Sequence, residues 1–102
     1  MELVSLLSLI QTPDIYDGQL VRVVALASVE FEKVALWGAQ EYLDNFIPKN
    51  AVWLSLDDFK TYLPLNGRTV IVEGTFTSHS NGHLGLFTGT IESVTRIEAW
   101  QP

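Results

Sequence analysis

The sequence predicts a mainly β fold, a five-stranded Greek-key barrel with an N-terminal helix and a short helix between the third and fourth strands. Two observations favour this fold. Strand-length runs rich in valine, leucine and isoleucine are separated by Asp-Gly and Asn-Gly turns along the chain of 102 residues. Hydrophobic residues make up 47% of the chain, enough to fill one core without cross-links, so residues 1–102 are expected to form one domain.

The first expected element is a short amphipathic helix within MELVSLLSLIQTPD. Ser5 and Ser8 share one face of this helix. The segment has no basic start and no small-residue cleavage site, so it is expected to belong to the mature protein and not to a signal peptide. No stretch of the sequence approaches the length of a membrane span. The face of the expected helix opposite Ser5 and Ser8 carries the apolar residues Leu3, Val4, Leu6, Leu7, Leu9 and Ile10.

Two strands and an irregular segment follow. Residues 19–29 (QLVRVVALASV) have the valine-rich composition of a long, largely buried strand. Residues 30–33 (EFEK) form a tight polar tip, and residues 34–39 (VALWGA) resume as a second strand. The mixture of polar and aromatic residues in the segment 39–50 (AQEYLDNFIPKN) predicts a long loop or an irregular helix.

The third strand and a short helix come next. Residues 51–56 (AVWLSL) return to strand character, and residues 57–63 (DDFKTYL) are expected to form a helix. Ser55 or Asp57 can cap this helix, because a short side chain with an oxygen accepts hydrogen bonds from its free amides. Pro64 is expected to end it.

The last two strands are expected to form a hairpin. Asn66-Gly67 turns the chain into the strand 68–80, and residues 83–100 return as the fifth strand. Asn81-Gly82 between them is the typical sequence of a two-residue type I′ turn, which needs positive φ at both positions. This turn would place the following residues opposite each other: Ser80 and His83, His79 and Leu84, Ser78 and Gly85, Phe76 and Phe87, Gly74 and Gly89, Val72 and Ile91.

The register of this hairpin bears on a metal site. His79 and His83 fall on opposite faces, so they cannot chelate one ion, and no third histidine is present. We therefore expect no metal and interpret both histidines as surface or turn residues, although a longer loop would relax this geometry. The paired Gly74 and Gly89 mark a sharp bend or the close approach of another backbone.

Two segments of the chain have similar sequences, and we call this similarity the sequence echo. YDGQLVRVVALA (16–27) and LNGRTVIVEGTF (65–76) each combine an upstream proline, an Asx-Gly turn and a V-x-V strand. Two copies do not make a repeat protein, so the echo indicates that one helix, turn and strand unit is used twice in the same sheet.

Three motifs carry a resemblance to a known family. They are P-x-x-Y-D-G-x-x-V-x-V (13–23), N-G-x-x-V-x-V-x-G-x-F (66–76) and G-H-x-G-x-x-x-G-x-I-x-x-V-x-R-I (82–97). Over nearly the whole chain, the sequence resembles the oligonucleotide/oligosaccharide-binding (OB) fold, in particular the small domains called tRNA-anti-like. The resemblance implies a ligand site on strands two and three and on the loops after strands one and four, formed here by Trp37, Trp53, residues 30–33 and residues 80–82.

The charge of the chain does not suit a general nucleic-acid binder. The net charge is −6, and the basic residues are scattered singly: Arg22, Lys33, Lys49, Lys60, Arg68 and Arg96. Phosphate contacts supply much of the affinity for nucleic acids, so nucleic acid is an unlikely partner.

The sequence carries no signature of catalysis. It contains no cysteine, no G-x-S-x-G, no phosphate-binding loop and no H-E-x-x-H, so we expect neither an enzyme nor a cofactor. Asp57-Asp58 is interpreted as the start of a helix, where acids complement the helix dipole. The lack of cysteine agrees with a cytoplasmic location.

Two segments combine acids with aromatic residues, and such surfaces suit a basic protein partner. The predicted partner-binding residues are Glu30, Phe31 and Glu32 at the tip, Glu41, Tyr42, Asp44 and Phe46 in the irregular segment, and Trp37 and Trp53 on the strands. The alternative is that Tyr42 and Phe46 fold inward to close the barrel and that the tryptophans, Trp100 included, pack in the core or at its rim.

Three functions follow from these patterns. The favoured one is a non-catalytic protein-binding module, in its sharpest form an acidic inhibitor or immunity protein that neutralises a basic toxin or nuclease. The second is an OB-type binder of single-stranded nucleic acid or a small ligand. The third is a self-associating structural domain.

Overall fold

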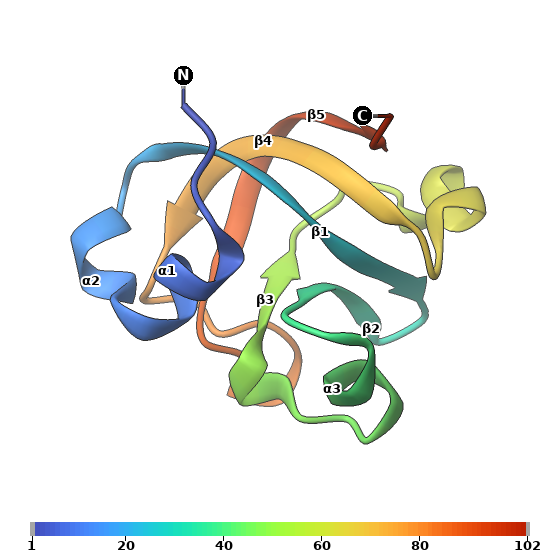
Figure 1. Ribbon diagram of the computed structural model, residues 1–102, viewed down its shortest axis with the longest axis horizontal. Helices are drawn as coiled ribbons and strands as arrows, with labels where there is room; N and C mark the ends of the chain where they lie inside the picture. The colour runs from blue at the N-terminus through green and yellow to red at the C-terminus, as the bar shows by residue number, and fades with distance from the viewer. Residues whose placement is uncertain (1, 102) are drawn as a thin grey trace.

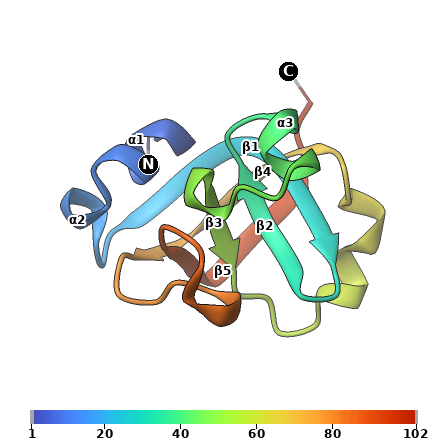
Figure 2. The same ribbon diagram turned by 90° about the horizontal axis from the view of Figure 1, so that it is seen from below.

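Five strands close into a hydrogen-bonded ring in the computed structural model, which describes residues 2–101. The ring has the order β1-β2-β3-β5-β4, with β4 bonded back to β1 (Figures 1 and 2). Only the β3–β5 pairing within this ring is parallel. The mainly β prediction is thereby confirmed. The strands are β1 Leu20–Glu30, β2 Lys33–Trp37, β3 Ala51–Leu54, β4 Thr69–Thr77 and β5 Thr90–Ala99.

Short helices precede β1 and connect β2 to β3, β3 to β4 and β4 to β5. They comprise the α-helices α1 Leu6–Gln11, α2 Pro13–Tyr16 and α3 Gln40–Asp44, and the 3-10 helices η1 Pro48–Asn50, η2 Phe59–Leu65 and η3 His83–Gly85. The expected irregular helix in the segment 39–50 is thus α3 followed by η1.

The N-terminal helix starts later than its apolar pattern indicates. Ser5 is the N-cap of α1, because its side chain accepts a hydrogen bond from the Ser8 amide at 3.1 Å. Leu6 and Leu9 are buried against the ring, whereas Leu3 and Leu7 are exposed. The cap, and not the apolar pattern, therefore decides where α1 begins.

The second expected helix differs from its prediction in three respects. Residues 59–65 form a 3-10 helix, and its cap is Asp58, whose side chain accepts from the Lys60 amide at 3.1 Å. Ser55 and Asp57 are not the cap, since Asp58 directly precedes the first helical residue. Pro64 lies inside the helix and does not end it. A proline in the last turn removes only one hydrogen bond and is tolerated there.

The core fills the inside of the ring. Alternate residues of each strand point inward, as the period of two along a strand requires. Leu6 and Leu9 of α1 extend this core at one end of the ring. Its buried strand residues are Val21, Val23, Ala27, Val34, Leu36, Val52, Leu54, Val70, Val72, Phe76 and Ile91.

The two copies of the sequence echo pair with each other as β1 and β4. Asp17 and Asn66 have nearly the same backbone, with φ −58° and ψ 127° in one and φ −58° and ψ 128° in the other. Gly18 and Gly67 follow with φ of +79° and +80°, a region that glycine occupies without strain. The two turns are structural equivalents at opposite ends of one antiparallel ladder.

Each turn extends and then closes the ladder in the same way. The Gly18 amide donates to the Phe76 carbonyl at 2.8 Å, and the Gly67 amide donates to the Ala27 carbonyl at 2.9 Å. Beyond these bonds, each Asx side chain accepts a hydrogen bond from one more backbone amide. Asp17 accepts from Ser78 at 2.8 Å, and Asn66 accepts from Val29 at 2.7 Å. We call these two units the Asx-Gly clamps.

A charged triad ties β1, β4 and β5 together on the outside of the ring. The Glu73 carboxylate accepts from Arg22 at 3.1 Å and from Arg96 at 2.9 Å. The hydrogen bond from Arg96 is the largest cause that holds the pKa of the Glu73 carboxyl below its usual value of 4.5. Glu73 is thus stabilised as a carboxylate in the folded protein.

The predicted type I′ hairpin at Asn81-Gly82 is wrong. In the observed register Phe76 lies opposite Ile91 and Thr77 opposite Thr90, so residues 78–89 form a loop between β4 and β5. Gly82 has φ 69° and ψ −155°, which is outside a type I′ turn. We call residues 78–89 the β4–β5 loop.

The two glycines expected to face each other are also displaced. A β-carbon on Gly74 would lie 2.9 Å from the Glu92 carbonyl oxygen, and one on Gly89 would lie 2.6 Å from the Phe76 ring. The strand register shifts between Glu73 and Thr75. The pairing was therefore wrong, but both glycines do permit the close approach that the sequence indicated.

Removal of a clamp acceptor tests the role of the Asx-Gly clamps. We expect Asn66→Ala to lower the free energy of unfolding by about 1–3 kcal/mol, because the amide of the buried Val29 loses its partner. Asp17→Ala is the matched comparison and should cost less, since its Ser78 partner bond is exposed to water. Urea unfolding followed by tryptophan fluorescence measures both, and equal losses would contradict this interpretation.

The lowered pKa of Glu73 predicts a pH dependence. A carboxyl with a depressed folded pKa contributes stability that is complete above its unfolded value of 4.5 and is lost as the pH falls through the folded value. Glu73→Gln should therefore flatten the acid side of the stability profile. Glu92→Gln, at an exposed carboxyl on β5, is the control. Urea midpoints measured from neutral to acid pH give the profiles, and parallel profiles for Glu73→Gln and the parent would refute the assignment.

Candidate functional site

The β1–β2 tip presents an aromatic ring to solvent between two acids. Glu30 pairs with Lys33 across the strands, so Phe31 and Glu32 alone make the turn, with Glu32 at φ +62°. The Phe31 side chain is 77% exposed, because neither neighbouring strand offers it a place in the core. Glu30 forms an ion pair with Lys33 at 3.4 Å. The tip therefore has the shape that the sequence indicated.

The second segment that combines acids with aromatic residues, 39–50, lies away from the β1–β2 tip. Glu41 and Asp44 are exposed on α3, which lies at the opposite end of β2 from the tip (Figure 2). Phe46 packs against Trp37 with ring centroids 6.0 Å apart, and Tyr42 is half-buried against the same cluster. The structure therefore separates the two segments. Tyr42 and Phe46 pack against the cluster around Trp37 and not into the core inside the ring, as the alternative interpretation had expected, and Phe46 stays 42% exposed.

Trp37 is part of a second core on the outside of the ring. Its side chain is only 1% exposed, and its indole N–H donates to the Ser28 hydroxyl at 2.8 Å. Ser28 in turn donates to the Lys33 carbonyl at 2.8 Å, so every buried polar atom of this chain of bonds has a partner. Trp37 is not accessible to a partner, and we leave it out of the surface proposed below.

A row of aromatic rings covers the outer face of β2 and β3. Phe87, from the β4–β5 loop, has its ring centroid 6.0 Å from that of Trp37 and 5.2 Å from that of Trp53. The row continues to His83, which stacks on Trp53 with centroids 6.3 Å apart and an interplanar angle of 25°. The face that the family resemblance assigns to a ligand is therefore largely filled by the protein's own loop.

Gly82 allows the β4–β5 loop to lie flat on Trp53. A β-carbon at Gly82 would be 2.6 Å from the Trp53 Cβ atom, which is too close for any other residue. Asn81 holds the loop closed, because its side-chain amide donates to the Phe87 carbonyl at 2.9 Å. Asn81-Gly82 thus serves close packing and not the two-residue turn.

An open groove remains at the end of this row, beside the tip. It has a volume of about 280 Å³ and is bordered by the β1–β2 tip, β3 with the segment after it, and η3. These segments meet along one edge of the molecule in Figure 2. We call it the tip groove. Its lining residues are Phe31, Glu32, Val34, Trp53, Leu54, Ser55, Leu56, Phe59 and His83.

The tip groove includes residues that the sequence pattern did not single out. Phe59 was interpreted only as part of a helix, and His83 only as a turn residue. Both reach the groove because β3 and the β4–β5 loop end beside the tip, and this is a tertiary arrangement that no local pattern signals.

The tip groove has one carboxylate among its lining residues, that of Glu32. The Glu32 carboxylate lies 3.5 Å from Nε2 of His83 across the groove. Asp57 and Asp58 lie in the segment that leads from β3 to Phe59, and Lys33 is already paired with Glu30. A cation that enters the groove would therefore meet the Glu32 carboxylate.

The other histidine lies apart from the tip groove. Nε2 of His79 is 3.3 Å from the Asp17 carboxylate, whose pKa is lowered mainly by the backbone hydrogen bond from Ser78 and further by His79. Within residues 2–101, no three histidine, aspartate or glutamate side chains are grouped to hold a metal ion.

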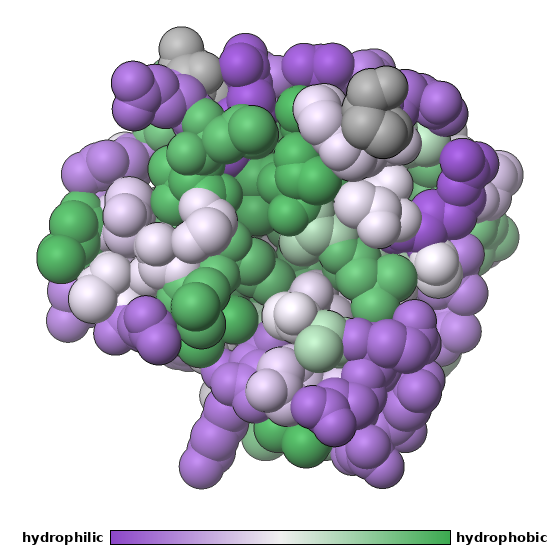
Figure 3. Space-filling model, viewed as in Figure 1, coloured by the Kyte–Doolittle hydropathy of each residue, from purple (hydrophilic) through white to green (hydrophobic). Residues whose placement is uncertain are grey.

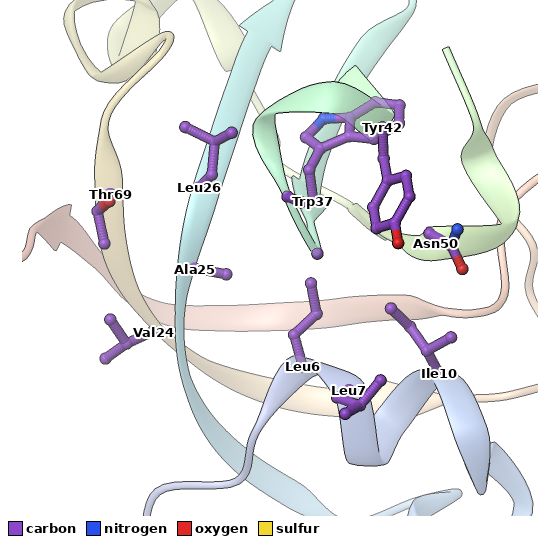
Figure 4. Close-up of a pocket in the computed structure, with 12 residues that line it drawn as sticks. Leu6, Leu7, Ile10, Val24, Ala25, Leu26, Trp37, Tyr42, Asn50 and Thr69 are labelled. Atoms are coloured by element: carbon purple, nitrogen blue, oxygen red, sulfur yellow. The ribbon is translucent and has the colours of Figure 1, made fainter. Parts of the chain in front are cut away.

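A larger groove of about 510 Å³ lies between α1, the middle of β1 and the start of α3. Figure 4 shows Leu6 and Ile10 of α1 facing Trp37 and Tyr42 across this space. Figure 3 shows the same region as an apolar surface over α1 and β1 that borders the polar surface of α3. No charged residue lines it. It therefore lacks the mixed chemistry of the tip groove.

Comparison of the chain with known protein families, with curated proteins and with solved structures found no match. Among residues 2–101, no helix has the length and apolar character needed to cross a membrane.

A pair of glycine substitutions tests the packing of the β4–β5 loop. We expect Gly85→Ala to cost about 1 kcal/mol, since its φ is +68° but a β-carbon there meets nothing within 4 Å. Gly82→Ala should cost about 1–3 kcal/mol more, because a methyl group at this position collides with Trp53. The free energy of unfolding and the tryptophan emission maximum are measured for both. An emission shift in Gly85→Ala alone would contradict the assigned packing.

Proposed function

We propose that this protein is a non-catalytic binding module that engages a basic protein partner through the tip groove and the exposed β1–β2 tip. In its sharpest form it is an acidic inhibitor or immunity protein that neutralises a basic toxin or nuclease. The observation that carries the proposal is the convergence of Phe31, Trp53 and His83 with Glu32 around one groove, from three segments distant in the sequence.

The contact residues that support this proposal have the properties of a protein interface. Phe31 is a large ring held in water by a two-residue turn, and aromatic residues are enriched at the cores of protein interfaces. The carboxylates of Glu30 and Glu32 flank it and would guide a basic surface toward the groove. Glu41 and Asp44, at the far end of β2, add to the negative field of a chain with net charge −6.

We further propose that the ring is an OB-type barrel. Its strand order and its single parallel pairing of β3 with β5 agree with that assignment. OB-type ligand sites lie between the loop after strand one and the loop after strand four. The tip groove has this location, so the proposed protein interface would occupy the position that ligands occupy in other OB domains.

Single-stranded nucleic acid or a small ligand is the second candidate, because Trp53 and His83 form a stack of the kind on which bases lie. Two observations weigh against nucleic acid. Phe87 and Trp37 already fill the neighbouring outer face of β2 and β3, and the groove carries Glu32 in place of a basic residue.

Phe31→Ala tests the proposed interface. Because Phe31 is exposed, the variant should keep its free energy of unfolding within about 0.5 kcal/mol of the parent, while partner binding falls about tenfold or more. Ile15→Ala is the matched control, since Ile15 is 65% exposed on α2, at the opposite side of the molecule from the tip (Figure 1). The partner is captured from nuclease-treated lysate of the source organism, identified by mass spectrometry and titrated by calorimetry.

The outcomes of this experiment separate the candidate functions. A basic protein bound by the parent and Ile15→Ala, but not by Phe31→Ala, supports the proposal. Equal loss in both variants would refute the tip as the interface. Binding of a labelled single-stranded oligonucleotide that quenches tryptophan fluorescence, and that high salt abolishes, would favour the second candidate. A concentration-dependent oligomer with no other ligand would favour a self-associating domain.

A further inference from the structure

We propose that the tip groove is a pocket for a single organic cation, the ammonium or guanidinium head of a lysine or arginine side chain. This inference rests on the proposed function, since it names the chemical group of the partner that the groove would take. Three observations support the inference: the aromatic walls of the groove, the carboxylate at its rim and its size.

The walls present aromatic surface from three different segments. Phe31 comes from the β1–β2 tip, Trp53 from β3 and Phe59 from η2, and all three line one groove. The ring contacts found in residues 2–101 join Trp53 to His83 and Phe87, while Phe31 and Phe59 take part in none. Phe31 is exposed, so its ring can contact an occupant, whereas Phe59 is half-buried against the core and offers the groove only its exposed part. Cations bind favourably over aromatic faces, and several such faces together form a cage for ammonium groups.

The charge of the rim selects a cation over a neutral group. Glu32 lines the groove and lies 3.5 Å from His83, an imidazole that is charged only when protonated. Glu30, by contrast, is already engaged by Lys33 at 3.4 Å and by the Asn66 amide at 3.2 Å. Glu32 is thus the carboxylate of the tip that is placed to receive a positive charge from outside.

The size of the groove limits what enters it. A volume of about 280 Å³ lies just below the range of about 300–1,000 Å³ typical of drug-sized ligand sites. It matches the end of one side chain better than a nucleotide or a folded element. The partner's basic residue would then occupy the groove while its surrounding surface contacts Phe31 from outside.

Two pairs of probes of equal shape and unequal charge test the inference on the whole protein. Choline is compared with 3,3-dimethyl-1-butanol, and doubly blocked arginine with doubly blocked citrulline. Each is titrated while the amide signals of Phe31 and Glu32 and the indole N–H signal of Trp53 are followed by NMR. We expect saturable shifts with both cations and binding at least tenfold weaker for both neutral probes.

Three variants assign the binding to the named groups. Glu32→Gln should weaken the binding of both cations about two- to fivefold, which is the loss typical of an exposed ion pair. Phe31→Leu keeps an apolar side chain but removes its π face, so it should also weaken the binding of both cations about two- to fivefold. Glu41→Gln, at an exposed acid on α3, is the matched control and should change nothing.

Each outcome bears on the inference separately from the proposed function. Equal binding of charged and neutral probes, or equal losses in Glu32→Gln and Glu41→Gln, would overturn the cation pocket, as would the lack of saturable shifts. A protein partner that depends on Phe31 would still uphold the proposed function in that case. Conversely, cation binding that depends on Glu32, together with no basic partner, would refute the proposed function and uphold the pocket.

Discussion

The antiparallel ladder between β1 and β4, fixed at both ends by the Asx-Gly clamps, is the interaction on which the other parts of the structure depend. Without it the sheet would be open, and two strands would expose unpaired amides and carbonyls along their edges. Each clamp gives a partner to its glycine amide and to one further backbone amide, Ser78 at one end and Val29 at the other. Asn66 also donates to Glu30, which connects the ring closure to the β1–β2 tip.

The β4–β5 loop covers much of the outer face of β2 and β3, and it thereby determines where on this face a partner can bind. The β4–β5 loop lays Phe87 and His83 over β2 and β3, and the resulting aromatic row leaves a groove at the end beside Phe31. A face that is broad in the bare strand arrangement is thereby reduced to a narrow groove. The acids of α3 remain outside it, at the other end of β2, where they can add to the electrostatic field without touching the same occupant.

Local patterns predicted the parts of this fold that local forces determine. The valine-rich run of β1 and the exposed tip at Phe31 follow from alternation and turn length, and both were found where the sequence indicated. The register of β4 and β5 was missed because Asn81-Gly82 is a strong hairpin signal, yet its glycine is needed for contact with Trp53, which is a tertiary requirement. The grouping of Phe59 and His83 with Phe31 was missed for the same reason, since only the closed ring brings these segments together.

The sequence separation of the two clamps has a consequence for how the protein folds. β1 pairs with β2 through a two-residue turn, a contact that forms quickly, whereas the β1–β4 ladder joins segments that lie roughly half of the chain apart. The entropy of closing so long a loop is recovered only when the ladder is nearly complete. Ring closure is therefore the late, cooperative event in folding, and a nascent chain that has not yet released β4 carries an unpaired β1 edge that only the second copy of the same motif can cover.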